Sequence, residues 1–258
     1  MTDKLWTALA LVAFCGALAS GGHPDRVKAQ SASTPIRALK PPANGRINVA
    51  VLISEGTVVI DFAGPWEVFG DTMFTSEGQP WKGGDDMIMP FNLYTVSDSL
   101  KPVSANGLIL APNYTFENAP KPQVIVIPAQ AGRSEAQKKW LLENSKTADV
   151  TMSVCTGASM LAAYGFLDHQ KATTHHMSLE ELQKKYPNVE FVSGTRFVDN
   201  DRVATAGGLS SGIDLALHVV ERYYGREIAQ ATADYMEYKG ELWKNPQYGE
   251  VKAVAAKN

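Results

Sequence analysis

The chain has 258 residues, of which 45% are hydrophobic and 20% charged. This is enough apolar material for one sizeable α/β core, and it excludes disorder over most of the chain. The 24 Lys and Arg residues and 27 Asp and Glu residues give a formal net charge of −3. No basic excess exists to neutralise phosphates, so we expect no nucleic-acid partner. The two cysteines, Cys15 and Cys155, are too few for a disulfide framework or a cysteine-rich zinc site.

Residues 1–19 have the pattern of a secretory signal peptide. Lys4 supplies a cationic start, an apolar stretch follows, and Ala17 and Ala19 form a small-x-small cleavage site. A retained membrane anchor is the alternative, but a helix of about fifteen residues spans only about 22 Å of a bilayer core that is roughly 30 Å thick. We therefore expect cleavage, loss of Cys15, no stable membrane insertion after processing, and a periplasmic or secreted product.

Residues 20–44 are rich in Ser, Ala, Pro and Gly and show no hydrophobic period, which predicts a flexible linker. One domain is predicted over residues 45–225, followed by a C-terminal helix and tail over 226–258. Within the domain, short β-branched runs indicate buried strands and helical spacing indicates amphipathic helices. The predicted strands are 47–53, 91–96, 124–127 and 150–154, with a hairpin at 197–204, and the predicted helices are 64–69, 134–144, 155–164, 213–223 and 228–238.

Three local signals refine this prediction. Pro65 suits the first turn of a helix that opens at Gly64, and Ser134 suits an N-cap. Residues 72–89 have no period and predict an inserted loop, which either lies over a site or is a passive surface excursion. Its anchors or substrate contacts would be Trp81, Met87 and Met89. The alternation of strands and helices predicts a mostly parallel sheet covered on both faces.

Cys155 is the centre of the predicted chemistry. It lies between a buried strand and a helix that starts with Thr156 and Gly157, a sharp turn in the crevice where open α/β folds bind ligands. The free N–H groups at a helix N-terminus lower the pKa of a thiol and favour the thiolate. The alternative is that Cys155 is a small buried hydrophobic residue.

Four motifs in this order resemble the ThiJ/PfpI superfamily: Asp61–Phe69, Val154–Ala158, Lys171–His175 and Ala206–Ala216. The resemblance covers residues 46–225 and is closest to the isonitrile (isocyanide) hydratases and the ligand domains of AraC-type regulators. It implies an α/β class I glutamine amidotransferase-like domain, a flavodoxin-like three-layer sandwich with a mostly parallel sheet and Cys155 at a nucleophile elbow. A homodimer is also implied.

The resemblance implies roles for single residues. Asp61 matches the acidic residue that acts at the cysteine, and Asp rather than Glu favours hydration over deglycase-like or glyoxalase-like chemistry. The alternative for Asp61 is an ordinary helix cap. Thr156 stands where protease-like members carry histidine, which argues against a Cys-His peptidase. Thr156 and Gly157 are candidate substrate-binding residues.

His175 matches a histidine that approaches the cysteine in deglycase-like members, where it could orient the thiolate. The alternative is a structural histidine beside the sheet. His176 is expected to face away, and two adjacent histidines make a poor metal site because adjacent side chains usually diverge. We therefore predict no metal and no cofactor.

Residues 128–132 occupy the place of the family's Pro-Gly-Gly loop, whose backbone N–H groups face the cysteine. Ala129 and Gln130 stand for the glycines and are the remaining substrate-binding candidates. Their backbone donors keep this role only if the turn needs no positive φ.

The implied reaction is cofactor-free hydration of a small-molecule isocyanide, with Cys155 as nucleophile and Asp61 moving the proton. Glyoxalase-like or deglycase-like processing of an aldehyde would use the same thiolate. A non-catalytic periplasmic ligand or redox sensor is the other alternative. The DNA-binding module of an AraC-type regulator is not expected, since residues 226–258 are too few for its two helix-turn-helix motifs.

Overall fold

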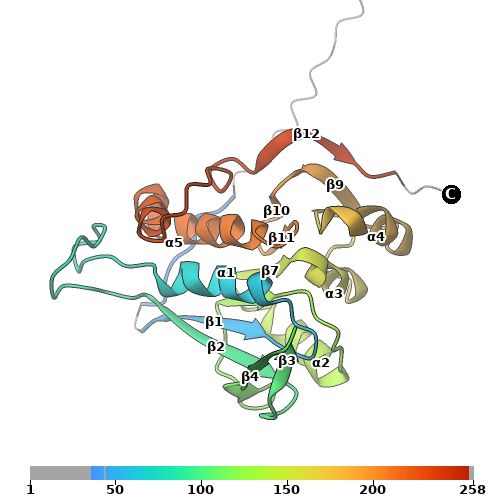
Figure 1. Cartoon of the computed structure of the whole chain (residues 1–258), viewed down its shortest axis with the longest axis horizontal. Helices are drawn as coiled ribbons and strands as arrows, with labels where there is room; N and C mark the ends of the chain where they lie inside the picture. Colours follow the sequence, from blue (N-terminus) through green and yellow to red (C-terminus); the bar gives the residue numbers. More distant parts are fainter. Residues whose placement is uncertain (1–35, 44, 256–258) are drawn as a thin grey trace, which may run out of the picture. The chain divides into compact units, whose positions relative to one another are not determined.

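The computed structural model describes residues 36–43 and 45–255, so the predicted signal peptide and most of the predicted linker lie outside the described residues. A seven-stranded sheet runs through the middle of the molecule in the order β10-β11-β7-β6-β1-β2-β5 (Figure 1). Every neighbouring pair is parallel except β10 with β11, which confirms the predicted mostly parallel sheet. Its strands are β1 (Ile47–Leu52), β2 (Phe91–Ser97), β5 (Tyr114–Thr115), β6 (Val124–Ile127), β7 (Val150–Val154), β10 (Phe197–Asp199) and β11 (Val203–Ala206).

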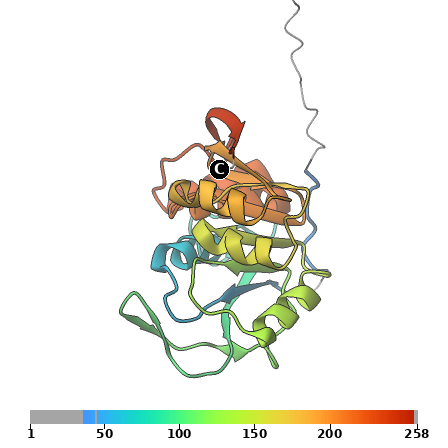
Figure 2. The same cartoon turned by 90° about the vertical axis from the view of Figure 1, so that its right-hand side faces the viewer.

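Helices cover both faces of this sheet, as the view in Figure 2 shows. The helices α1 (Val59–Gly70) and α5 (Ser211–Tyr235) pack on one face, and α2 (Glu135–Asn144), α3 (Ala158–Ala163) and α4 (Leu179–Lys185) pack on the other side. Alternate strand residues serve the two cores: Val49 and Val51 belong to the first, whereas Ala50 and Leu52 belong to the second. This is the predicted three-layer α/β sandwich.

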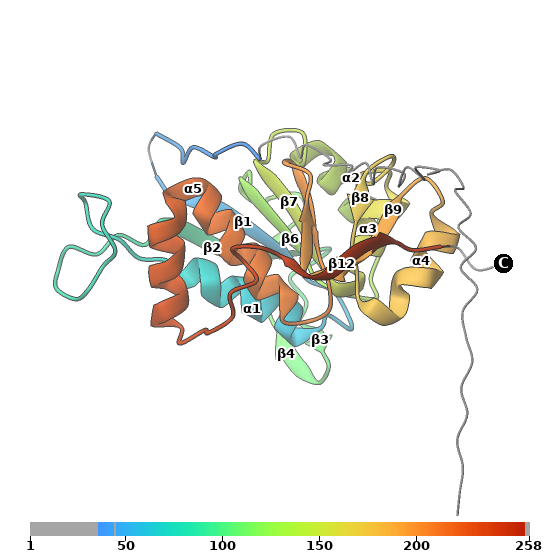
Figure 3. The ribbon, with the colours of Figure 1, turned by 90° about the horizontal axis from the view of Figure 1, so that it is seen from above.

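Two smaller sheets complete the fold. The strands β12 (Gln247–Ala253), β9 (Glu190–Thr195) and β8 (Lys171–Ala172) form one, and β3 (Val103–Ala105) and β4 (Leu108–Leu110) form the other. β12 pairs antiparallel with β9 and crosses the molecule in the view of Figure 3. A Cβ atom on Gly194 of β9 would lie 2.3 Å from the carbonyl oxygen of Glu250, so glycine is required where these strands meet. None of the described helices has both the length and the apolarity to cross a membrane.

The predicted start of α1 is wrong. The helix begins at Val59 rather than Gly64, and Pro65 is its seventh residue. Pro65 therefore lies beyond the first turn, where its missing N–H leaves one helical hydrogen bond unmade.

The helices predicted at 213–223 and 228–238 run on from each other as α5, and they meet at Gly225, whose φ of 84° and ψ of 168° break the regular geometry.

Close contacts bring α1 and α5 together at the carboxyl end of β7. A Cβ atom on Gly64 would lie 2.9 Å from the Ile213 side chain, and a Cβ atom on Gly212 would lie 2.9 Å from Val154. Both positions need glycine because a larger residue would force the two helices or the strand apart. The beginnings of the two helices are thereby held beside Val154, the residue before Cys155.

The inserted loop over residues 72–89 does not lie near Cys155. Because α1 runs back against β1, the loop begins at the amino edge of the sheet, and β2 starts from that same edge. In Figure 1 it is the long teal loop on the left, whereas α3 lies on the right, toward the carboxyl ends of the strands. Within it Phe74 bridges to Pro80 and Ile88, and the Trp81 indole donates to the Gly84 carbonyl. The idea that this loop covers the site is therefore wrong.

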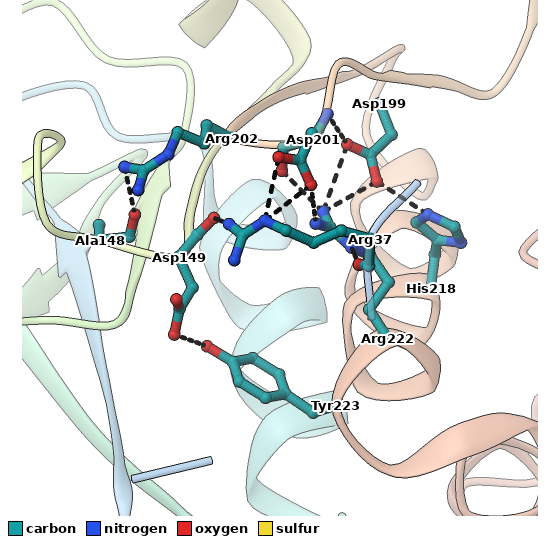
Figure 4. Close-up of polar contacts among 9 residues, drawn as sticks. All are labelled: Arg37, Ala148, Asp149, Asp199, Asp201, Arg202, His218, Arg222 and Tyr223. Atoms are coloured by element: carbon teal, nitrogen blue, oxygen red, sulfur yellow. Dashed lines mark hydrogen bonds and ion pairs between the residues drawn. The ribbon is translucent and has the colours of Figure 1, made fainter. Parts of the chain in front are cut away.

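A network of charged side chains fixes residues 36–39 to the same amino edge (Figure 4). The buried guanidinium of Arg222 contacts Asp199 at 3.0 Å and Asp201 at 2.8 Å, and Asp201 also pairs with Arg37 at 3.0 Å. Asp199 accepts a further contact from His218 at 2.9 Å. The network ties α5, the turn between β10 and β11, and the first described residues into one unit.

Candidate active site

Cys155 lies at the sharp turn that the sequence predicts. β7 ends at Val154, and Cys155 opens a short 3-10 turn, η1 (Cys155–Gly157), that leads into α3. Its φ is 57°, a left-handed conformation that costs a non-glycine residue on the order of 1–3 kcal/mol. Two contacts hold this conformation: the Cys155 N–H donates to the Gly207 carbonyl at 2.8 Å, and the Thr174 hydroxyl donates to the Cys155 carbonyl at 2.8 Å.

Gly157 allows the turn to pack against the end of β6. A Cβ atom at this position would lie 2.2 Å from the carbonyl oxygen of Ile127. Gly157 is buried, and the contact explains the residue type by close packing rather than by contact with a substrate. The half-buried Thr156 is placed differently, since its backbone N–H faces the Cys155 sulfur.

Asp61 lies in the first turn of α1 and is completely buried. One carboxyl oxygen, Oδ2, accepts from the Ala129 N–H at 3.1 Å, and the Cys155 side chain is its other polar neighbour. Val58, not Asp61, is the N-cap residue, so the capping alternative is wrong. The structure therefore brings the two principal predicted residues, Asp61 and Cys155, side by side.

The environment of this pair shifts both pKa values upward. Burial raises the pKa of Asp61 from 3.8 to about 6, against the lowering effect of its bonds with Ala129 and Cys155. Burial also raises the pKa of the Cys155 thiol, and the negative charge of Asp61 adds to the rise. The N–H groups of Thr156 and Leu209 oppose this but do not outweigh it. The expected low thiol pKa is thus wrong, because the sulfur is buried beside a carboxylate.

The two groups consequently titrate as a pair. Between about pH 6 and the raised thiol pKa, Asp61 and Cys155 hold one proton between them. That proton needs only a short transfer to pass from sulfur to carboxylate. The Leu209 N–H that faces the sulfur comes from a residue with a φ of 50°, in the loop before α5, and sequence reasoning did not single it out.

The loop over residues 128–132 keeps its backbone geometry without the family glycines, because neither Ala129 nor Gln130 has a positive φ. Three of its four N–H groups are already used, however, and only that of Gln130 has no acceptor among the described residues. Ala129 donates to Asp61, Ala131 to the Glu55 carbonyl, and Gly132 to the Ser54 hydroxyl. Ala129 therefore positions Asp61. The amide oxygen and nitrogen of Gln130 are buried and have no hydrogen-bond partner among the described residues.

His175 is half-buried and lies beside the elbow rather than on the sulfur. Its ring packs against Gly208, where a Cβ atom would lie 2.6 Å from the ring, and its Nδ1 accepts from the Met177 N–H at 3.4 Å. The groups that act on the thiol are Asp61 and the N–H groups of Thr156 and Leu209. The ring of the exposed His176 lies 4.5 Å from that of His175, so the expectation that the two side chains diverge is wrong. The described residues hold no group of three or more His, Cys, Asp and Glu placed for a metal.

A cavity of about 450 Å³ lies beside the elbow, although neither Cys155 nor Asp61 is among the residues that line it. Two of its lining residues touch the elbow directly: Thr174 through its hydroxyl and Leu209 through its N–H. Other lining residues come from β9, from the start of α5 and from the segment after α5, and they include Arg196, Leu242 and Tyr248. Sequence reasoning missed these three because only the tertiary fold brings them to the elbow.

The sequence pattern of the DJ-1/PfpI family matches residues 47–222. Isonitrile hydratase from Pseudomonas putida is 27% identical over 198 residues, which are 74% of this chain and 78% of that protein. The transcriptional regulator GbdR of Pseudomonas aeruginosa is 26% identical over 140 residues, which cover 53% of this chain but only 38% of the regulator. Among solved structures, a ThiJ/PfpI family protein from Pseudomonas syringae superposes with a TM-score of 0.64 at 23% identity, covering 87% of this chain and 85% of that one.

Proposed function

Because the chain belongs to the DJ-1/PfpI family, we propose that it is a cysteine-dependent enzyme that hydrates a small isocyanide to an N-substituted formamide. The observation that carries this proposal is the buried Asp61 carboxyl beside the Cys155 thiol. A nucleophile on η1 and a proton-transfer group on α1 are thereby placed side by side. The similarity to isonitrile hydratase supports the same reaction.

The proposed first half of the reaction forms a thioimidate. The Asp61 carboxylate takes the thiol proton, and the Cys155 sulfur attacks the terminal carbon of R–N≡C. Asp61 then gives the proton to that carbon, which yields R–N=CH–S–Cys155. The N–H groups of Thr156 and Leu209 stabilise the negative charge on the sulfur before it attacks. A carboxyl with a pKa of about 6 suits this exchange at neutral pH.

In the second half, water adds to the thioimidate carbon, and the carbon–sulfur bond breaks. One water proton remains on the substrate nitrogen, and the other returns to the Asp61–Cys155 pair, so the product is R–NH–CHO and the enzyme regains its starting form. No cofactor takes part in this scheme. Asp61 acts as base and acid in turn, which requires a pKa near the working pH.

Aldehyde processing is the second candidate, and the backbone donors argue for the isocyanide. Attack on an aldehyde places charge on an oxygen, which needs an N–H donor of its own. In the loop over residues 128–132, the N–H groups of Ala129, Ala131 and Gly132 are already committed, which leaves only that of Gln130 for such a charge. Attack on an isocyanide places the charge on carbon, where Asp61 delivers a proton.

A ligand or redox sensor is the third candidate, and the regulator relatives favour it. Burial of Cys155 and its raised thiol pKa argue against ready oxidation, which proceeds through an accessible thiolate.

We further propose that the chain is exported, cleaved after Ala19 and active as a homodimer. Amino-terminal sequencing of the exported protein tests the cleavage, and an intact Met1 in the cytoplasm contradicts it.

The deciding experiment offers the purified protein a panel of isocyanides and, separately, methylglyoxal. We expect formamide to appear, as followed by NMR, and Cys155→Ala to abolish it. Consumption of methylglyoxal with no turnover of any isocyanide would replace hydration by aldehyde processing. Full isocyanide turnover by Cys155→Ala would remove the cysteine from the mechanism altogether.

A further inference from the structure

The cavity next to Cys155 has an uneven distribution of charge. Its lining includes one arginine, Arg196, and two histidines, His175 and His176, but no Asp or Glu. The residues before and at the start of α5, over 207–211, also line it, and a helix N-terminus carries positive potential. Each of these groups favours a negatively charged ligand over a positively charged one.

Arg196 is held in place from behind. Its Nε donates to Asp214 at 2.6 Å, and its Nη2 donates to the Ser210 hydroxyl at 3.1 Å. The other oxygen of Asp214 accepts from the Tyr238 hydroxyl at 2.9 Å. Asp214 has 1% of its side chain exposed, whereas Arg196 has 20%. The arginine therefore faces the cavity while its counter-ion lies beneath it with both oxygens occupied.

One end of this guanidinium remains available to a ligand. Its bonds to Asp214 and Ser210 use Nε and Nη2 and leave Nη1 free of both, although the guanidinium also contacts the Tyr238 hydroxyl. A guanidinium already fixed by two hydrogen bonds loses little freedom when it binds a carboxylate, and its planar donors match the two oxygens. The two histidines that also line the cavity add further N–H donors.

We propose that this cavity binds a carboxylate on the substrate, with Arg196 as the residue that recognises it. The inference rests on the proposed function, because the electrophilic end of the same molecule must reach Cys155. Leu209 connects the two places, since its N–H faces the sulfur and it also lines the cavity. The substrate class is then a small isocyanide that carries a carboxylate.

The segment after α5 adds an apolar part to the cavity wall. Leu242 and Tyr248 line it, and both lie beyond residue 222, where the match to the family pattern ends. Pairing of β12 with β9 fixes Tyr248 near Arg196, whose N–H donates to the Pro246 carbonyl at 2.8 Å. This segment supplies apolar surface for a short linker between the isocyanide and the carboxylate.

Calorimetry with the full chain carrying Cys155→Ala tests binding without turnover. The probes are N-formylglycine, which is the product expected from isocyanoacetate, and its neutral amide, N-formylglycinamide. We expect the carboxylate to bind about tenfold or more tightly than the amide, because a hydrogen bond to a charged group is stronger than a neutral one. Equal binding of the two probes would overturn the assignment.

Two further variants in the same background should change the binding of N-formylglycine in opposite directions. Asp214→Asn removes the negative charge behind Arg196 and should tighten binding of N-formylglycine severalfold. Arg196→Met combined with Asp214→Asn removes both charges together, which avoids a buried unpaired carboxylate, and should bind the two probes equally. Arg226→Met, at an exposed arginine on the second part of α5, is the matched control and should keep the preference.

The outcomes separate this inference from the function on which it rests. Survival of the carboxylate preference in the double variant would show that Arg196 is not the recognition residue. Turnover of neutral isocyanides in the wild-type chain with no preference for isocyanoacetate would leave hydration standing and reject the carboxylate site. Binding of N-formylglycine without turnover of any isocyanide would leave the carboxylate site standing and reject hydration.

Discussion

Asp61 is buried in a position that a carboxylate occupies only at a cost. It accepts one backbone N–H, from Ala129, and otherwise faces the Cys155 thiol. A buried carboxylate with so few donors takes up a proton more readily than one in water. The same burial that destabilises the charged form also gives the residue a pKa at which it can both accept and donate a proton.

Asp61→Asn should lower isocyanide turnover by about 10² to 10⁴-fold, the usual range for the loss of general acid–base help. The substitution keeps the size of the side chain and an oxygen for the Ala129 N–H but removes the titrating group. The wild-type kcat/KM should fall as pH drops through about 6, because protonated Asp61 cannot take the thiol proton. Rate profiles over pH 5–8 test this, and a variant that keeps the same acid limb would exclude Asp61 as its source.

The Cys155 thiol should titrate above the value of a free cysteine, which is about 8.5. Burial and the charge of Asp61 both raise its pKa, and Asp61→Asn should lower the midpoint because it removes one of the two causes. Rates of alkylation by iodoacetamide against pH give both midpoints, with Cys155→Ala as the blank. A wild-type midpoint well below 8.5 would mean that the backbone N–H groups outweigh burial.

At the scale of elements, the site depends on how closely its parts approach one another. The turn η1 contacts the end of β6 through Gly157, and α1 reaches α5 through Gly64. Neither glycine has a positive φ, so close packing rather than backbone conformation explains them. These contacts fix the positions of Asp61 and Cys155. A small displacement of α1 or η1 would separate the pair.

Gly157→Ala should destabilise the fold by about 1–3 kcal/mol or more, since the new methyl group would overlap a backbone carbonyl that cannot rotate away. Gly70→Ala is the matched control. There the Cβ atom would make an ordinary 3.4 Å contact with Leu93 at the end of α1, so its effect should be small or stabilising. Urea unfolding of both variants measures the difference, and equal stability would contradict the packing argument.

At the scale of the whole molecule, local signals predict the central strands and the elbow. β1, β6 and β7 are short β-branched runs between turn residues, and their positions were predicted within a residue or two. β12 was not predicted, because all seven of its residues are exposed and only its pairing with β9 makes it a strand. The same reasoning applies to the site: the motifs predict Cys155 and Asp61 as reacting groups, whereas the contact of Leu209, which lies within the 206–216 motif, and the place of Arg196 follow only from the tertiary fold.

The candidate active site and the Arg222 network lie at opposite edges of the central sheet. Cys155 lies where β7 ends, whereas the Arg222 network lies at the amino edge, beside the turn that precedes β11. Arg222 and Asp199 each have only 4% of their side chains exposed. Removal of one partner therefore leaves an unpaired charge in a poorly hydrated place. This should lower the free energy of unfolding and leave the rate of the reaction unchanged.

Arg222→Met should lower the free energy of unfolding by about 3–5 kcal/mol, because Asp199 keeps only His218 and the Asp201 backbone N–H as partners while Asp201 still has Arg37. Adding Asp199→Asn should recover part of the loss, since the unpaired charge disappears. Calorimetric or urea unfolding gives these values, and kcat/KM measured well below the unfolding temperature should stay close to wild type. Unchanged stability in Arg222→Met, or no recovery in the double variant, would show that burial of the Asp199 charge is not what the arginine compensates.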